Sequence, residues 1–415
     1  MAHIPKLNLF LDVNMPHIED FIEELRKGIG LSHKTQIRAL KLILCNLYEN
    51  QHKEIRVYRG KTALAVQKYN PLKIGYRPFI GALDALAKYE WIDQVIGITG
   101  KTMTTIKATS KLIQWFNEIG WSEETIKVTL SQYITLRENK KIGNRSVYLD
   151  YADTDYSRWL QEELNKYNQL LNSSEIVLKD QNGSTVKSYK NLTLQRKFIR
   201  HSNNKLKNGE FIFGGRMPGP WTNLSSQQRK RIYINGEPAV ELDRESSHLN
   251  AMYQVVTGAP YTGIEPYKLE INGLLIPRHI IKKFSSLMQN GKTPSGTANS
   301  VIRAYKKELD LTKYDEYLEI KKKVSPGEII NAILDKHSVI APYYLNGKTY
   351  GDYISCWESD IVFEVVIELT RRNIPCLTIY DSFIVPLQYK ELVDEMKDKT
   401  PYINRRRLDK VALRK

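Results

Sequence analysis

The sequence predicts an α+β protein in which a mainly helical N-terminal region precedes a domain built on an antiparallel sheet. Apolar residues recur at helical spacing in the segments 18–29, 33–50 and 76–93. Two later runs of β-forming residues each carry a single aspartate, Asp243 in the first and Asp381 in the second. Because 415 residues exceed what one ordinary core organises, the chain is expected to fold as two or three domains.

The first of these domains is predicted to span residues 1–118. Its helices are followed by a short strand at 93–99 and by a further helix at 104–120. Helices followed by a β-ribbon occur in this order in winged-helix modules, and also in plain helical subdomains. The region is therefore expected either to bind nucleic acid through a winged helix or to be a helical subdomain without that role.

The second region, residues 119–204, is predicted to be a linker or a thumb-like segment. It mixes short helical patterns with one hairpin pattern at 174–190, where Asn182–Gly183 is a turn signal. In the third region, residues 205–415, a glycine-rich stretch leads to a strand, and a long helical zone follows. A helix, a strand, a turn and a second strand are expected around Asp381.

The formal net charge of +16 is concentrated rather than evenly spread. Basic residues cluster at 187–207, 278–283, 321–323 and 405–415. Such clusters attract phosphate, and the 25 tyrosines suit stacking on bases. The charge predicts a nucleic-acid partner, and its alternative explanation is a well-solvated basic surface.

The sequence pattern predicts neither membrane insertion nor secretion. No apolar run approaches the length that crosses a bilayer, and no basic segment at the N-terminus leads into a long apolar one. Cys45, Cys356 and Cys376 lack the paired spacing of a disulfide framework or a zinc cluster. A reducing, cytoplasmic location is therefore expected.

Asp243 and Asp381 are the candidates for chemistry. A strand that ends in one carboxylate, beside a hairpin that carries another, would place the two side by side. Such a pair can hold two Mg²⁺ ions, or Mn²⁺ as a substitute, with Leu242 as a further candidate ligand. One ion would activate a 3′-hydroxyl and both would neutralise a triphosphate. The alternative for Asp243 taken alone is a helix cap.

Cations for the leaving phosphates are offered by a helix predicted to run from Pro277 to Gly291. Arg278 and Lys282 stand four positions apart on it, so they share one face. The proline at its start and the glycine at its end agree on these boundaries. Taken alone, two cations at this spacing would be a solvated helix face.

In this order, the elements resemble four motifs of the DNA polymerase I-like (family A) enzymes and the single-subunit, phage-type RNA polymerases. The stretch "GGRMPG" at 214–219 resembles their Gly-Arg element. The strand ending in Asp243 resembles the first motif, and Arg278 and Lys282, followed by an Asn-Gly pair, keep the spacing of the second. "YDSF" at 380–383 resembles the "HDSF" of the RNA polymerases.

The resemblance covers roughly residues 205–390 and implies a right-hand polymerase palm with helical fingers. It implies metal binding by Asp243 and Asp381, and binding of the β- and γ-phosphates by Arg278 and Lys282. It also implies that the following residues lie near the base pair or the nucleic acid: Asn290 and Gly291 at the nascent base pair, His248 at the sugar, and Arg216 and Tyr380 at the nucleic-acid strand.

Three positions depart from the pattern of these families. Asn290 replaces the tyrosine of the second motif, and Tyr380 replaces the histidine of the third. Five residues after Asp243, where the DNA enzymes carry Glu and the RNA enzymes Gly, this chain carries His248. Its bulk favours deoxynucleotides by clashing with a 2′-hydroxyl, although it could instead hydrogen-bond that hydroxyl or simply pack within its helix.

The sequence thus predicts a template-directed nucleotidyltransferase that extends DNA by two-metal-ion phosphoryl transfer. Its partners would be a DNA primer–template and nucleoside triphosphates, with RNA as an alternative nucleic acid. No proofreading is expected, because Asp12 and Asn14 stand where an exonuclease needs Asp-x-Glu. The alternatives are a primer-independent RNA polymerase or primase, a template-independent transferase, and a non-enzymatic replication initiator with a degenerate palm.

Overall fold

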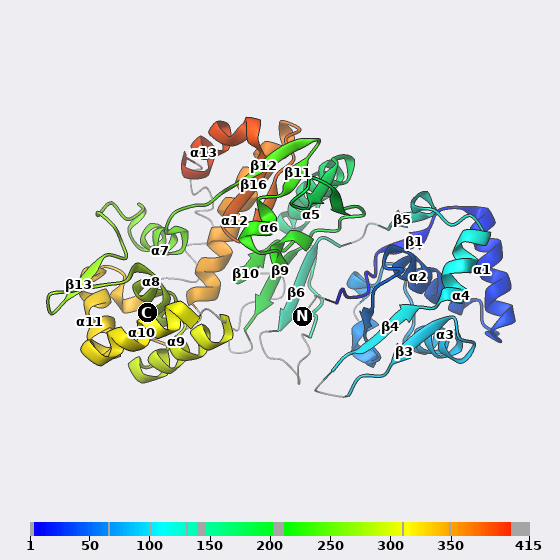
Figure 1. The fold of residues 1–415 in the computed structure, drawn as a ribbon, viewed down its shortest axis with the longest axis horizontal. Helices are drawn as coiled ribbons and strands as arrows, with labels where there is room; N and C mark the ends of the chain where they lie inside the picture. Colours follow the sequence, from blue (N-terminus) through cyan, green and yellow to red (C-terminus); the bar gives the residue numbers. More distant parts are fainter. Residues whose placement is uncertain are drawn as a thin grey trace. The chain divides into compact units, whose positions relative to one another are not determined.

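The computed structural model describes residues 4–64, 67–98, 102–129, 132–138, 147–201, 211–308, 311–347 and 350–399 (Figure 1). The chain divides into two units. The first comprises Met1–Glu210, Met217–Ala239 and Asn373–Pro375, and the second comprises Phe211–Arg216, Val240–Arg372 and Cys376–Lys415. Helices alternate with several antiparallel sheets, which confirms the α+β class. The basic cluster at 405–415 lies outside the described residues.

The N-terminal part of the first unit is organised around one central helix. Its helices are α1 (Pro16–Gly28), α2 (Thr35–Glu49), α3 (Tyr76–Lys88) and α4 (Ser110–Glu118). Eight of the nine residues from Ala39 to Leu47 in α2 are buried. They are buried because α1, α3 and β1 (Leu11–Val13) all pack against this helix. The predicted helices at 18–29, 33–50 and 76–93 are therefore present, with ends that differ by a few residues.

The prediction of a helix at 104–120 is wrong for the first half of this segment. Thr104–Ala108 form strand β4, which pairs antiparallel with β2 (Ile55–Val57) on one side and β3 (Ile92–Val95) on the other. Its β-branched residues favour a pleated strand, and pairing on both edges overrides the helical periodicity. Helix α4 begins only after Thr109, whose hydroxyl accepts a hydrogen bond from the Leu112 amide at 3.4 Å.

The remainder of the first unit combines a long helix with short strands. Helix α5 (Asp155–Ser173) has 19 residues, so the prediction of only short helices in this region is wrong. The predicted hairpin is confirmed as β7 (Ile176–Lys179) and β8 (Thr185–Ser188), and Gly183 in its turn has a φ of +83°. The other strands are β5 (Ile126–Val128), β6 (Ile134–Glu138), β9 (Arg196–Arg200) and β11 (Ile232–Ile234).

Pairing in the first unit is mostly antiparallel. β1 pairs with β5, and β11 pairs with β7 and with the first residues of β12 (Glu237–Leu242). β6 and β9 form a parallel pair. Short helices complete the unit: η1 (Lys61–Leu64), η2 (Gln67–Tyr69), η3 (Glu123–Thr125), η4 (Pro220–Asn223) and α6 (Ser226–Arg229).

The second unit contains three of the motifs that carry the resemblance and the first half of the fourth, Gly214–Arg216. Its strands are β10 (Gly214–Arg216), the end of β12, β13 (Leu269–Ile271), β14 (Leu274–Ile276), β15 (Leu377–Ile379) and β16 (Ser382–Pro386). Its helices are α7 (Ser247–Thr257), α8 (Arg278–Met288), α9 (Pro294–Glu308), α10 (Leu311–Lys323), α11 (Pro326–Lys336), η5 (Ala341–Tyr343), α12 (Tyr350–Arg371), η6 (Leu387–Tyr389) and α13 (Lys390–Lys399).

Two groups of elements make up this unit. Helices α8 to α11 pack on one another as a helical group with the β13–β14 hairpin beside it (Figure 1). Helix α12 packs against α7 and β10, and β16 lies between β15 and β12. The helix, strand, turn and strand predicted around Asp381 are confirmed as α12, β15 and β16. This second group positions the candidate active site.

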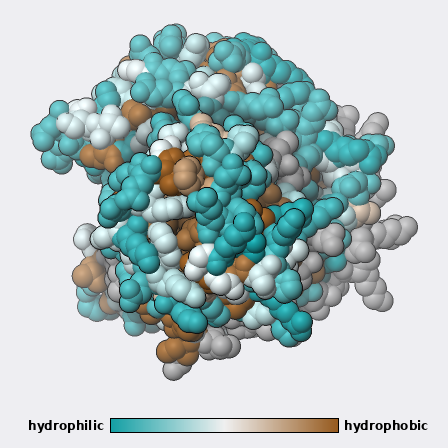
Figure 2. Space-filling model, turned by 90° about the vertical axis from the view of Figure 1, so that its right-hand side faces the viewer, coloured by the Kyte–Doolittle hydropathy of each residue, from teal (hydrophilic) through white to brown (hydrophobic). Residues whose placement is uncertain are grey.

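The surface is largely polar where it can be seen. On the face drawn in Figure 2, hydrophilic side chains predominate and the hydrophobic areas are small and separate. Among the described residues, no helix is both long and apolar enough to cross a membrane.

We expect Asn168→Ala to lower the free energy of unfolding by about 2 to 4 kcal/mol, measured by urea denaturation. Asn168 is 2% exposed, and its amide donates to the carbonyls of Leu164 (2.8 Å) and Leu194 (3.0 Å). The side-chain oxygen of Asn168 also accepts a hydrogen bond from the Leu194 amide at 2.6 Å. Alanine would therefore leave buried polar groups of the segment before β9 without hydrogen-bond partners. The exposed Gln181, in the β7–β8 turn, is the control, and an equal loss for Gln181→Ala would contradict this role.

Candidate active site

Asp243 and Asp381 come together in the second unit, although 138 positions separate them in the sequence (381 − 243). The hydroxyl of Ser382, the residue after Asp381, donates a hydrogen bond of 2.9 Å to Oδ1 of Asp243. The charge of Asp243 also contributes to raising the pKa of Asp381. The predicted juxtaposition of the two carboxylates is therefore present.

Asp243 is the first residue after a strand and is not a helix cap. Strand β12 ends at the buried Leu242, and the N-cap position of the helix that follows is Ser246, three residues beyond Asp243. Ser246 has a φ of +51°, which turns the chain sharply between strand and helix. The side chain of Asp243 is exposed, and Lys397 donates a 2.7 Å hydrogen bond to its main-chain carbonyl.

Asp381 lies in the turn between β15 and β16. The preceding Tyr380 has a φ of +53°, so a tight left-handed turn presents Asp381 at the end of the hairpin. Burial, together with the charges of Glu358 and Asp243, raises the pKa of Asp381 to about 6. The main-chain amide of Asp381 and the cation of Lys282 act in the opposite direction.

Glu358 is a third carboxylate of this region, and sequence reasoning missed it. It is 2% exposed, accepts a 3.0 Å hydrogen bond from Nη2 of Arg216, and lies 3.7 Å from Nδ1 of His248. Burial opposes its ionisation, but the hydrogen bonds and charges of His248 and Arg216 hold its pKa down to about 2. The signal in the sequence was a glutamate in the mostly apolar middle of α12, where Asp360 and Glu364 are further acidic residues.

Arg216 connects this carboxylate to the hairpin. Its side chain is 39% exposed, and its guanidinium lies over the ring of Tyr380, 4.9 Å from the centroid. Tyr380 is itself 53% exposed. Both residues predicted to contact nucleic acid therefore present part of their side chains to solvent beside Asp381.

Arg278 and Lys282 lie on the exposed side of α8, as their spacing predicts. The Lys282 cation is close enough to lower the pKa of Asp381. The Arg278 guanidinium lies 5.2 Å from the ring centroid of Tyr267, a buried residue that sequence reasoning also missed. Burial raises the pKa of Tyr267 to about 12, with Glu358 and Asp381 adding to the rise and Arg278 opposing it.

Asn290 and Gly291 are engaged in packing. Helix α8 ends at Met288 rather than at Gly291. The Asn290 carboxamide oxygen accepts a 3.2 Å hydrogen bond from the Gly351 amide at the start of α12. A Cβ at Gly291 would lie 2.5 Å from Oγ1 of Thr297, so glycine is needed for this close approach. A role for either residue at a base pair stays a prediction.

The donor set suits a hard divalent cation held by few protein ligands. Among the described residues, no group of three or more His, Cys, Asp or Glu side chains is arranged to hold a metal ion. Two carboxylates are nevertheless what Mg²⁺ commonly takes from a protein when water and substrate phosphates complete its shell. Burial and the neighbouring charges of Glu358 and Asp243 disfavour the ionised form of Asp381, and a bound cation would stabilise that form.

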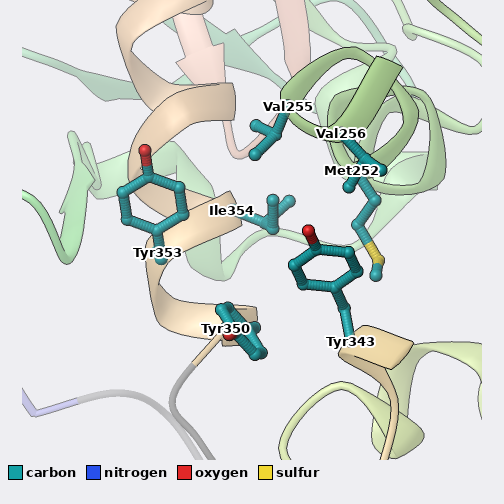
Figure 3. A pocket seen from close by; sticks show the side chains of 7 residues that line it. All are labelled: Met252, Val255, Val256, Tyr343, Tyr350, Tyr353 and Ile354. Atoms are coloured by element: carbon teal, nitrogen blue, oxygen red, sulfur yellow. The ribbon is translucent and has the colours of Figure 1, made fainter. Parts of the chain in front are cut away.

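A nearby apolar cavity does not compete with this site. Figure 3 shows the side chains that line this cavity, which come from α7, from the start of α12 and from Tyr343 of η5. Its volume of about 10 Å³ is at the lower limit for a single water molecule, so it is a packing defect rather than a ligand site. Its lining residues are Met252, Val255, Val256, Tyr343, Tyr350, Tyr353 and Ile354.

Comparison with known proteins adds no relative. No protein-family model, no curated protein and no solved structure matches the chain. The arrangement of its own residues is therefore what any functional argument has to use.

We expect Asp381→Asn to raise the free energy of unfolding by about 1 to 3 kcal/mol at pH 8 in the presence of EDTA. The folded-state pKa of about 6 exceeds the ordinary value of 3.8, so ionised Asp381 destabilises the fold above pH 6. Asp381 becomes protonated in the folded state as the pH falls through 6 towards 4, and this destabilisation disappears. The free energies of unfolding of the wild type and of Asp381→Asn should therefore become equal near pH 4. Thermal and urea denaturation over pH 4 to 8 measure it.

Mg²⁺ should raise the melting temperature of the wild-type protein more than that of Asp381→Asn. Glu391→Gln, an exposed carboxylate on α13, is the control and should change neither quantity. A variant Asp381→Asn that is less stable than the wild type at pH 8 would show instead that the carboxylate holds the hairpin turn.

Proposed function

We propose that the second unit is the catalytic domain of a nucleotidyltransferase that extends a nucleic-acid chain, most simply a DNA polymerase without proofreading. The observation that supports this most strongly is the meeting of Asp243 and Asp381 with the Lys282 cation beside them. Carboxylates beside fixed cations are what transfer of a nucleotidyl group requires, because charge builds up on the phosphate oxygens.

Each element of the proposed palm and fingers has a place in this scheme. Asp243 and Asp381 would hold Mg²⁺, which when bound neutralises triphosphate charge and lowers the pKa of a 3′-hydroxyl. Arg278 and Lys282, on one exposed helix face, would bind the leaving phosphates. Arg216 would lie against the nucleic-acid strand, since its guanidinium is partly exposed next to Asp381.

The first unit would supply further nucleic-acid binding. In its N-terminal part, α2, β2, α3, β3 and β4 follow one another, and β4 lies between β2 and β3 in the sheet. This order supports the winged-helix interpretation of the region 1–118. The net charge of +16 favours the same kind of partner.

We expect the wild-type protein to extend a labelled primer on a DNA template with Mg²⁺ and dNTPs. Asp243→Ala and Asp381→Ala should each lower the rate by about 10³-fold or more, because neither variant retains the paired carboxylates. Gel analysis of the products measures this, with NTPs in a parallel reaction. Products from NTPs without a primer would favour a primase. If wild type and Asp381→Ala bind DNA equally and neither incorporates a nucleotide, the proposal of an enzyme fails.

Lys282→Ala should lower kcat/KM for the incoming nucleotide by about 10- to 100-fold, the cost of one lost charge-assisted hydrogen bond to phosphate. Lys283→Ala is the matched control, because this neighbour has the same charge but lies over the ring of Tyr305 at 5.5 Å. Single-nucleotide incorporation measures both variants. Equal losses would show that only the general charge of α8 matters.

A further inference from the structure

Glu358 has a position that the proposed reaction does not by itself explain. Its carboxylate is buried beneath two partly exposed side chains, Arg216 at 3.0 Å and His248 at 3.7 Å. Each of its oxygens faces one of them: Oε2 accepts from Arg216 and Oε1 faces His248. A buried charge with two defined partners is costly to disturb, because its removal takes an interaction from both of them.

The packing of α12 holds Glu358 in place. This helix contacts both α7, which carries His248 in its first turn, and β10, which ends with Arg216. Cys356 and Ser359, on either side of Glu358, donate to main-chain carbonyls of the β10 segment, those of Phe211 and Gly215 respectively. Glu358 is therefore held by the main chain of its neighbours as well as by its own hydrogen bond.

We propose that Glu358 is a positioning residue that fixes His248 so that the site selects deoxyribose over ribose nucleotides, an inference that rests on the proposed function. The side chain of His248 is 24% exposed, five residues after Asp243. An imidazole that is free to rotate would turn away from an approaching 2′-hydroxyl and would hardly exclude ribonucleotides. A ring whose Nδ1 faces the buried Glu358 carboxylate at 3.7 Å loses this contact when it turns away, so the contact favours the orientation that maintains the clash.

The hydrogen bond between Glu358 and Arg216 has a different effect on activity, which can be measured separately. Arg216 joins Glu358 to Tyr380, whose neighbour is Asp381. Loss of the carboxylate would loosen Arg216 for every substrate alike, since Arg216 lies towards the nucleic-acid strand in the proposed function. The ratio of kcat/KM for a dNTP to that for the matching NTP therefore isolates the effect of the contact between Glu358 and His248.

The test is a double-mutant cycle of His248→Ala, Glu358→Gln and the double variant, with single-nucleotide incorporation of dNTP and NTP on one primer–template. Glu358→Gln should lower the dNTP/NTP ratio by about 10-fold in the wild-type background and leave it unchanged in the His248→Ala background. The matched control is Glu368→Gln on the same helix, which pairs with Arg372 at 2.8 Å and should keep the wild-type ratio.

Three results would overturn the inference. The two substitutions could change the ratio independently, or Glu358→Gln could slow both nucleotides equally, and either result would leave the proposed function intact. A wild-type protein that incorporates neither nucleotide would overturn the proposed function and this inference with it. If Glu358→Gln does not fold, Glu358→Asp replaces it, because its shorter side chain keeps the charge but should still lower the ratio severalfold.

Discussion

Three carboxylates share one region of the second unit, and the surroundings of two of them, Glu358 and Asp381, shift their pKa values in opposite directions. Glu358 is balanced by Arg216 and His248, and its pKa falls to about 2 in spite of burial. Asp381, by contrast, has its pKa raised to about 6 by burial and by the charges of its acidic neighbours. The fold therefore accepts a destabilising charge at the end of a hairpin, a cost that is typical of functional sites rather than of structural ion pairs.

Helix α12 makes this arrangement possible. It carries Glu358 in its buried middle, contacts α7 and β10, and leads through a short loop into β15 and the turn that holds Asp381. The hydrogen bonds from Cys356 and Ser359 fix its position against β10. A shift of this one helix would move the histidine, the arginine and the hairpin together, so the precision of the site depends on its packing.

Local patterns predicted the helices of the N-terminal region, the β7–β8 hairpin and the placement of Asp243 and Asp381. They failed at Thr104–Ala108, because a strand paired on both edges is decided by distant partners rather than by its own periodicity. Glu358 and Tyr267 were missed for a similar reason, since their importance lies in contacts with residues far along the chain. No motif spacing encodes such contacts. A charged residue in a mostly apolar helix nevertheless indicates in the sequence that a buried charge needs a partner.

The three departures from the family pattern turn out to be connected through α12. His248 faces Glu358, Tyr380 lies on the guanidinium that Glu358 binds, and Asn290 accepts a hydrogen bond from Gly351 at the start of the same helix. Residues that share one network are not expected to vary independently, because each replacement changes the partners left to the others. His248, Tyr380 and Asn290 thus belong to one set of contacts around α12.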